Sequence, residues 1–216
     1  MYNSFAKDFD RTRTAIWPCV KNFLHNHIPR YAFVIDIGAG NGKYVKYLEN
    51  SHLHTHAHAH ITATDISFPL LEIIKEKSTS HNVNLFQANG LHLPIKDSMF
   101  DTAISIAVVH HIPTHDQRIN FIKEALRIIK SKTGQLFITV WALEQPIKSS
   151  WIPLSLTTAN SHDYNIPWNH TYSRFYHLFS ESEVKQIFED LLSENHIKEY
   201  HIFFEKNNWC IRCIKS

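Results

Sequence analysis

The fold of this protein is indicated by one stretch of its sequence, Ala32-Phe33-Val34-Ile35-Asp36-Ile37-Gly38-Ala39-Gly40-Asn41-Gly42-Lys43-Tyr44. The apolar residues 32–37 predict a buried strand, and residues 43–49 have the spacing of a helix. Three of the five glycines in the chain fall in the turn between them. Glycine lacks a Cβ atom and adopts a positive φ at little cost, so such a turn brings backbone N–H groups close to a ligand. A tight connection between strand and helix is the simpler alternative for the turn taken alone.

The alternation of strands and helices continues along the rest of the chain. Apolar spacing predicts further strands at 61–64, 83–88, 102–109 and 135–141, and helices at 14–28, 69–77 and 117–130. After an irregular aromatic stretch, a helix near 181–192 precedes strands at 200–205 and 209–214, which a three-residue turn joins into a hairpin. The pattern predicts an α/β fold, the Rossmann-like methyltransferase sheet: seven strands, mostly parallel, with a C-terminal antiparallel hairpin and helices on both faces.

Length and composition favour one domain. A chain of 216 residues suffices for one three-layered α/β domain and is short for two. We expect a single domain over 1–216, with an N-terminal helical segment at 1–30 and a substrate-side insertion at 143–180. No apolar run approaches the roughly 20 residues of a membrane-spanning helix, and no signal-like segment opens the chain, so we expect a cytoplasmic protein without a membrane partner. A net charge of +2 permits a nucleic-acid partner without indicating one.

Polar residues around the glycine turn predict the cofactor. Asp36 stands directly before the turn, where a carboxylate would repel a pyrophosphate but suits the ammonium group of a methionine moiety. Asp65 ends the next strand at about the spacing from the glycines at which an acidic residue binds a ribose diol. Asn89 and Gly90 end the third strand, where they are placed to face an adenine ring. We therefore predict S-adenosyl-L-methionine, bound by Asp36, Gly38, Gly40, Gly42, Asp65, Ile66, Asn89, Gly90 and Ala107.

Two sets of potential metal ligands are interpreted without a metal. Cys210 and Cys213 lie three residues apart in a predicted strand and point to opposite faces, which disfavours a shared zinc or redox site. With Cys19 they are too few for a disulfide framework. A run of alternating histidines would line one side of an extended segment and offers donors for zinc or nickel; it comprises His52, His54, His56, His58 and His60. No cysteine or carboxylate completes this set, so we interpret it as a low-complexity loop and expect no metal.

Further segments carry a more specific pattern than the glycine turn. They include Ser105-Ile106-Ala107-Val108-Val109-His110-His111, Val140-Trp141-Ala142-Leu143-Glu144-Gln145, Ile166-Pro167-Trp168 and Arg174-Phe175-Tyr176-His177-Leu178-Phe179. With these segments the chain resembles, through nearly its whole length, the tRNA carboxymethyluridine methyltransferases, which esterify the side chain of a modified wobble uridine. It departs from the family pattern at Ala39, where cysteine is usual, at Asn89, where aspartate is usual, and in a shorter stretch between Gln145 and Pro167 with few basic residues.

The resemblance implies an activity and two partners. The activity is methyl transfer from S-adenosyl-L-methionine to the carboxymethyl group of 5-carboxymethyluridine at the tRNA wobble position. The partners are the tRNA anticodon loop and a small zinc-binding activator subunit. The third strand, 83–88, is expected at an edge of the sheet, where unpaired backbone groups accept another strand, and we place the activator there.

The chemistry of that reaction indicates which side chains to seek. The nucleophile is a carboxylate with a pKa of about 4, which is ionised at neutral pH, so no general base is needed. The site must instead align one carboxylate oxygen with the sulfonium methyl group and exclude water. Candidates follow the fourth and fifth strands, where ligands of open α/β sheets bind, or come from the N-terminal segment; they are Arg174, His111, Arg13, Trp141, Trp168, His110 and His177.

Within this set, Arg174 is the best candidate to pair with the carboxylate, because a guanidinium group binds a carboxylate through two hydrogen bonds. Trp141 or Trp168 is a candidate to stack on the extruded base. Each histidine is equally compatible with a structural hydrogen bond, and each tryptophan with core packing.

Two other functions remain compatible with the sequence. The first is methylation of a small molecule such as a quinone precursor, because the core fold is shared. The second is a non-catalytic tRNA-binding or regulatory module that keeps the fold, which Ala39 and Asn89 favour. Binding of S-adenosyl-L-methionine separates the second alternative from the two enzymatic functions.

Overall fold

The structure is a computed structural model that describes residues 6–50, 59–79, 83–154, 162–168 and 172–216. Its centre is a seven-stranded sheet. The strands are, in spatial order, β3 (Val83–Gln87), β2 (His60–Asp65), β1 (Phe33–Ile37), β4 (Thr102–Ile106), β5 (Gln135–Trp141), β10 (Asn208–Lys215) and β9 (Ile197–Glu205). The first five are parallel, and β10 runs antiparallel between β5 and β9. The predicted sheet and its closing hairpin are confirmed, and β3 lies at an edge as expected.

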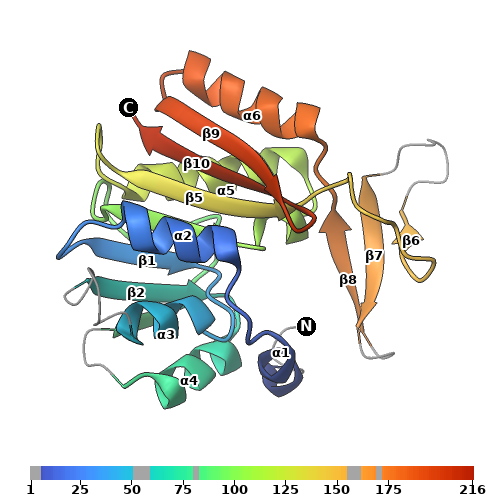
Figure 1. Ribbon diagram of the computed structural model, residues 1–216, viewed down its shortest axis with the longest axis horizontal. Helices are drawn as coiled ribbons and strands as arrows, with labels where there is room; N and C mark the ends of the chain where they lie inside the picture. Colours follow the sequence, from blue (N-terminus) through green and yellow to red (C-terminus); the bar gives the residue numbers. More distant parts are fainter. Residues whose placement is uncertain (1–5, 51–58, 80–82, 155–161, 169–171) are drawn as a thin grey trace.

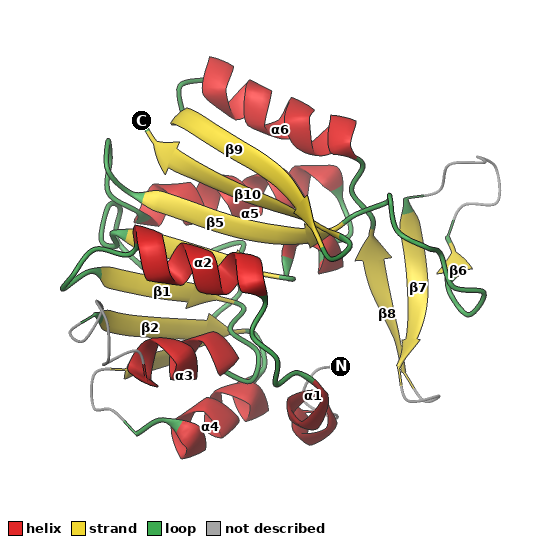
Figure 2. Cartoon of the chain, viewed as in Figure 1, coloured by secondary structure: helices red, strands yellow, loops and turns green. Residues whose placement is uncertain are grey.

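Helices cover both faces of this sheet (Figure 2). On one face lie α2 (Pro18–His27), α3 (Lys43–Asn50) and α4 (Phe68–Lys77), and on the other lie α5 (His115–Ile128) and α6 (Glu181–Ser193). The buried apolar residues accordingly form two clusters, one beneath each layer of helices. Side chains alternate along a strand, and Val34 therefore joins one cluster while Ile35 joins the other.

The N-terminal segment differs from the single helix expected at 14–28. It forms a short helix, α1 (Ala6–Thr12), and then α2, which begins at Pro18. Proline favours the first turn of a helix because its missing N–H has no partner there in any case. The apolar spacing within α2 was recognised correctly, but its start was placed too early, and α1 was missed.

The fourth strand is also shorter than expected. It ends at Ile106, and the chain then passes through Ala107, with a φ of +62°, into a 3-10 turn, η3 (Val109–His111). The residues from Ala107 to Val109 have the apolar character of a strand. They are nevertheless turned away from the ladder at its carboxyl end, where they line the site described below.

The aromatic stretch interpreted as irregular contains a second sheet. Its strands are β6 (Ile152–Pro153), β7 (Asp163–Trp168) and β8 (Tyr172–His177), all antiparallel, and Figure 1 shows them projecting beyond the main sheet. Trp151, Tyr164, Ile166, Tyr176 and Leu178 form a separate buried cluster in this part of the chain. The interpretation as irregular was wrong. In β7 the burial does alternate with period two, whereas in β8 Phe175 lies on the face opposite to Tyr172 and Tyr176 and hides that period.

The closing hairpin has a shorter turn than expected. Two residues, Lys206 and Asn207, separate β9 from β10, and both have a positive φ, of +47° and +62°. This backbone suits the twist of a two-residue hairpin.

The cysteines are buried thiols. Cys210 packs in the cluster beneath α2, and Cys213 in the cluster on the opposite face, as expected for a strand. The sequence did not indicate that Cys19 Sγ of α2 lies 3.5 Å from Cys210 Sγ. Of the histidine run, His52, His54, His56 and His58 fall outside the described residues, and His60 begins β2. No helix in the described part of the chain combines the length and apolar character needed to cross a membrane.

Candidate active site

The glycine turn is held open by backbone geometry and by a carboxylate. Gly38, Gly40 and Gly42 have φ values of +76°, +58° and +72°. A Cβ atom at Gly38 would lie 2.5 Å from Val108 Cγ2, so a larger residue does not fit there. The carboxylate of Asp65 accepts hydrogen bonds from the N–H groups of Gly40 and Ser67, both at 2.9 Å. Asp65 therefore fixes the turn directly, through two of its roughly four lone-pair directions.

A cavity of about 860 Å³ opens beside this turn, at the carboxyl ends of the parallel strands. This volume lies within the range of small-molecule and cofactor sites. Eight of the nine predicted cofactor residues line it: Asp36, Gly38, Gly40, Asp65, Ile66, Asn89, Gly90 and Ala107. Gly42 is absent from the lining because it faces α4, where a Cβ atom would lie 2.7 Å from Ile74 Cγ1. The Asn89 side-chain oxygen already accepts a hydrogen bond from the Leu91 N–H at 3.0 Å, which holds the side chain at the cavity.

Asp36 is a buried carboxylate with one oxygen that makes no hydrogen bond among the described residues. Its side chain is 1% exposed, and Oδ2 has no hydrogen-bond partner among the described residues. Burial, together with the nearby Asp65 carboxylate, raises the pKa of Asp36 from 3.8 to about 7, although Lys43 opposes the change. A bound ammonium group would stabilise the ionised carboxylate and satisfy the free oxygen.

The N-terminal helix covers the glycine turn. The side chain of Asn41 donates to Asp10 Oδ1 at 3.0 Å and to the Arg13 carbonyl at 3.2 Å, and Asp10 also pairs with Lys77 of α4. The ring of Phe9 lies 3.1 Å from the position that a Cβ atom at Gly40 would occupy. These contacts bring α1 to the carboxyl ends of the strands (Figure 1) and place Arg13 in the cavity lining.

The opposite wall combines aromatic rings with a buried cation. Arg174 of β8 is 4% exposed, and its guanidinium carbon lies 4.4 Å from the ring centre of Trp168 and 5.1 Å from that of Tyr176. Arg13 approaches the same Trp168 ring at 4.7 Å. Arg174 takes part in none of the ion pairs found among the described residues, and its Nε has no hydrogen-bond partner there. A buried cation of this kind is stabilised by an anion that enters the cavity.

The two adjacent histidines are neutral, positioned groups. The Nδ1–H of His111 donates to the Phe175 carbonyl at 3.0 Å, and Nδ1 of His110 accepts from the Trp141 N–H at 3.1 Å. Burial lowers the pKa of His111 to about 3 and that of His110 well below its usual range. At neutral pH neither imidazole carries a charge, so the cationic character of this wall rests on the arginines.

The structure brings together five of the seven predicted substrate-side residues, since Arg13, His110, His111, Trp141 and Arg174 all line the cavity. Trp168 lies behind Arg174 as its stacking partner, outside the lining. His177 is not brought into this group. It follows Tyr176 in β8, so it points to the opposite face of the strand, where it contacts Asp163 and Glu183.

Tyr176 is a cavity residue that sequence reasoning missed. Its ring lies 4.5 Å from that of Trp141, 4.4 Å from His111 and 5.2 Å from His110, centre to centre. Recognition of β8 as a strand would have indicated it, because residues 174 and 176 share one face.

Comparison with known proteins agrees with this geometry. Residues 35–138 match the family model described as a methyltransferase domain. The fold superposes with a TM-score of 0.72 on a chain from the complex between the Haloferax volcanii Trm112 methyltransferase activator and a methyltransferase, at 15% identity, covering all of this chain and 97% of that one. By this match residues 35–138 form a methyltransferase domain, and the sheet around the cavity has the fold of that solved structure.

The relatives with the most specific names are tRNA methyltransferases. The tRNA (carboxymethyluridine(34)-5-O)-methyltransferase of Saccharomyces cerevisiae is 40% identical over 145 residues, which are 67% of this chain and 48% of that protein. The Schizosaccharomyces pombe protein of the same name is 29% identical over 239 residues, covering all of this chain and 95% of that protein. The resemblance indicated by the sequence motifs is thus confirmed. The chain spans less than half the length of the plant and vertebrate relatives that it matches.

Proposed function

We propose that this enzyme forms the methyl ester of 5-carboxymethyluridine at the wobble position of tRNA, and that it does so in the cytoplasm. The names of the relatives support the substrate, and one observation in the structure carries the chemistry. Arg174 is a buried cation at the cavity wall with no carboxylate partner among the described residues. A substrate carboxylate would supply that partner, held by the two parallel N–H groups of the guanidinium.

Each predicted cofactor residue suits a different part of S-adenosyl-L-methionine. We assign Asp36 to the ammonium group of the methionine moiety. The backbone at Gly38 and Gly40 lets this moiety lie close to the turn. Asp65 keeps lone pairs free for the ribose hydroxyls beside Ile66. We assign Asn89 and Gly90 to the adenine end, and Ala107 to the floor between the two sites, with Gly42 shaping the turn from behind.

The substrate-side residues bind and orient the carboxylate. When bound, S-adenosyl-L-methionine supplies the methyl group on its sulfonium. No base is required from the neutral His110 and His111, which instead position Trp141 and β8 through their hydrogen bonds. Arg174 holds the carboxylate oxygens and Arg13 adds positive charge, while the aromatic rings exclude water from the site. Opposite charges cancel during the transfer, so a site that excludes water favours the transition state.

A direct assay tests the proposal. We expect the purified protein, supplied with labelled S-adenosyl-L-methionine, to convert 5-carboxymethyluridine in tRNA to its methyl ester, as measured by nucleoside mass spectrometry. Unmodified tRNA should remain unlabelled, because it lacks the nucleophile. Cofactor binding without methylation of this tRNA, with and without an activator, would favour a small-molecule substrate. Absence of cofactor binding would favour the non-catalytic alternative.

We also propose that a small zinc-binding activator subunit pairs with β3. The strand lies at the sheet edge, and its apolar residues Val83, Leu85 and Phe86 are only partly buried. A related fold occurs in a complex with the Trm112 methyltransferase activator of Haloferax volcanii, which supports an activator subunit as a partner. Edge strands accept a further strand through their free backbone groups.

Hydrogen exchange of the chain with and without a Trm112-type activator checks this placement. We expect the activator to slow exchange of the β3 amides by at least about tenfold, because strand pairing satisfies their outward-facing groups. The strand β9, at the opposite edge of the same sheet, is an internal control and should not change. Protection at β9 alone, or no complex at all, would contradict the proposed interface.

A further inference from the structure

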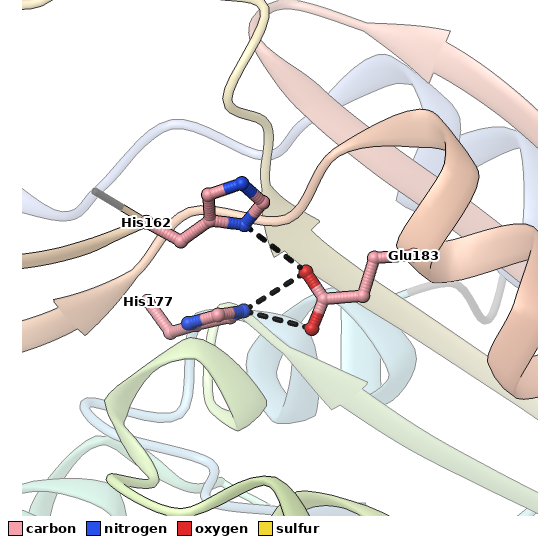
Figure 3. Close-up of side chains that lie close together, drawn as sticks. All are labelled: His162, His177 and Glu183. Carbon is pink, nitrogen blue, oxygen red and sulfur yellow. Dashed lines mark hydrogen bonds and ion pairs between the residues drawn. The ribbon is translucent and has the colours of Figure 1, made fainter. Parts of the chain in front are cut away.

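Two imidazoles and a carboxylate gather where the insertion meets α6 (Figure 3). His162 directly precedes β7, His177 ends β8, and Glu183 lies in the first turn of α6. Nε2 of His177 is 2.8 and 3.0 Å from the two Glu183 oxygens, and Nδ1 of His162 is 3.4 Å from Oε2. We propose that His162, His177 and Glu183 form a zinc-binding site, separate from the methyl-transfer site and independent of the proposed substrate.

The spacing of the donor atoms fits a tetrahedral ion. Zinc bonds to nitrogen and oxygen of about 2.0–2.1 Å place the donors of a tetrahedral site about 3.4 Å apart. The three ligand atoms all lie within 4.8 Å of one another, so shifts of about 1 Å or less bring them around one ion. Two histidines and a glutamate leave a fourth position for water. The His162 side chain is 30% exposed, which gives an ion a route from solvent.

The hydrogen bonds of His177 favour a cation at this point. Nδ1 of His177 donates its proton to Asp163 Oδ1 at 2.6 Å, so the lone pair on Nε2 is directed at Glu183. Two lone-pair atoms at 2.8 Å need a positive species between them, either a proton or a metal ion. A carboxylate that fixes the tautomer of a ligating histidine is the usual outer partner at zinc sites. His177 itself is buried, at 6% exposed.

The neighbouring charges decide how strongly an ion is held. Asp163 and Glu183 contribute two negative charges, while Arg118 approaches Glu183 only to 3.9 Å because the carbonyl groups of Ile112 and Pro113 hold its guanidinium. Arg118 therefore weakens the site without occupying it. A proton shared by His177 and Glu183 is the competing occupant, and the experiment below separates the two.

Metal binding here would join the insertion to the main domain. The ligands come from the residue before β7, from β8 and from α6, while Arg174 lies on the opposite face of β8 from His177. An ion would thus fix the strand that carries Arg174 against the core.

The test is a zinc titration of metal-free protein in which His52, His54, His56 and His58 have been replaced by asparagine. This background removes four of the five histidines of the run and keeps His60, which belongs to β2. Calorimetry should show one Zn²⁺ per chain, and Co²⁺ in its place should give the visible absorption of a tetrahedral complex. We expect His162→Gln and Glu183→Gln each to weaken zinc binding at least about tenfold, and Asp163→Asn to weaken it about 10–100-fold through the outer hydrogen bond.

The matched control is His196→Gln. His196 also contacts a carboxylate, Glu194 at 3.2 Å, but it has no third ligand among the described residues, so zinc affinity should be unchanged. Cofactor binding, measured on every variant, shows that the fold is retained. Failure of the background protein itself to bind zinc would overturn the proposal in favour of a shared proton. A zinc affinity in His162→Gln and in Glu183→Gln equal to that of the background protein would also overturn it.

Discussion

Replacing Arg174 with alanine should lower the rate of ester formation roughly a hundredfold to a thousandfold while leaving affinity for S-adenosyl-L-methionine nearly unchanged. The guanidinium is the buried cation of the substrate wall, whereas the predicted cofactor contacts come from the glycine turn and the ends of β2 and β3. Loss of Arg174 therefore removes the counter-charge and the alignment of the carboxylate, but not the cofactor site. Calorimetry with the cofactor and single-turnover methyl transfer to modified tRNA measure the two effects separately.

Two further variants sharpen this result. Arg174→Lys keeps the charge but not the paired N–H donors or the flat group that faces Trp168, so we expect only partial recovery of the rate. Arg30→Ala removes an exposed arginine outside the cavity lining and should behave as the wild type. A collapse of cofactor affinity in Arg174→Ala, with transfer otherwise intact at saturating cofactor, would contradict the assigned role.

Asp36→Asn should have opposite effects on stability and on cofactor binding. In the cofactor-free protein the ionised carboxylate is destabilised by burial, so a neutral amide of the same shape should raise the free energy of unfolding at pH 8 by at least about 1 kcal/mol. The amide has no charge for the ammonium group, so affinity for the cofactor should fall at least about tenfold. Chemical denaturation and calorimetry measure the two quantities.

The pH dependence gives the same prediction an independent check. The pKa of Asp36 is about 7 in the folded protein and near 3.8 when unfolded, so the folded state holds its proton more tightly. The free energy of unfolding of the wild type therefore falls relative to that of Asp36→Asn as pH rises from about 4 to about 7. Above about pH 7 the difference between the two proteins stays constant. Cofactor affinity of the wild type should rise over the approach to pH 7, because binding requires the ionised carboxylate. A stability difference between the two proteins that is independent of pH would refute this account.

Local patterns in the sequence predicted the sheet and the cofactor turn. A strand, three glycines and a helix follow one another within residues 32–49, and the positive φ values at Gly38, Gly40 and Gly42 are a property of that short backbone segment. The acidic residues that face the turn, Asp36 and Asp65, stand at the ends of two adjacent parallel strands. Because parallel strands present their carboxyl ends at one edge, their convergence follows from the topology alone.

The substrate side was predicted by residue type but not by position. The alternation of β8 was hidden among aromatic residues, so His177 was grouped with Arg174 although the two lie on opposite faces. Because β8 was not recognised as a strand, Tyr176 was not predicted in the cavity wall. For the same reason the cluster of potential metal ligands around His177, on the opposite face of β8, was not predicted.

By itself, the sequence determined the order of elements, the glycine turn and the chemistry of the groups around it, because these depend on spacing within short segments. Only the tertiary structure decided that α1 covers the turn through Asn41, and that Arg13 and Arg174 meet at Trp168. Arg13 and Trp168 lie far apart in the sequence, and their approach depends on packing between the two segments that carry them. The burial that leaves Arg174 without an ion pair and Asp36 Oδ2 without a hydrogen bond among the described residues is likewise a property of the folded cavity. It prepares that cavity for a carboxylate and an ammonium group.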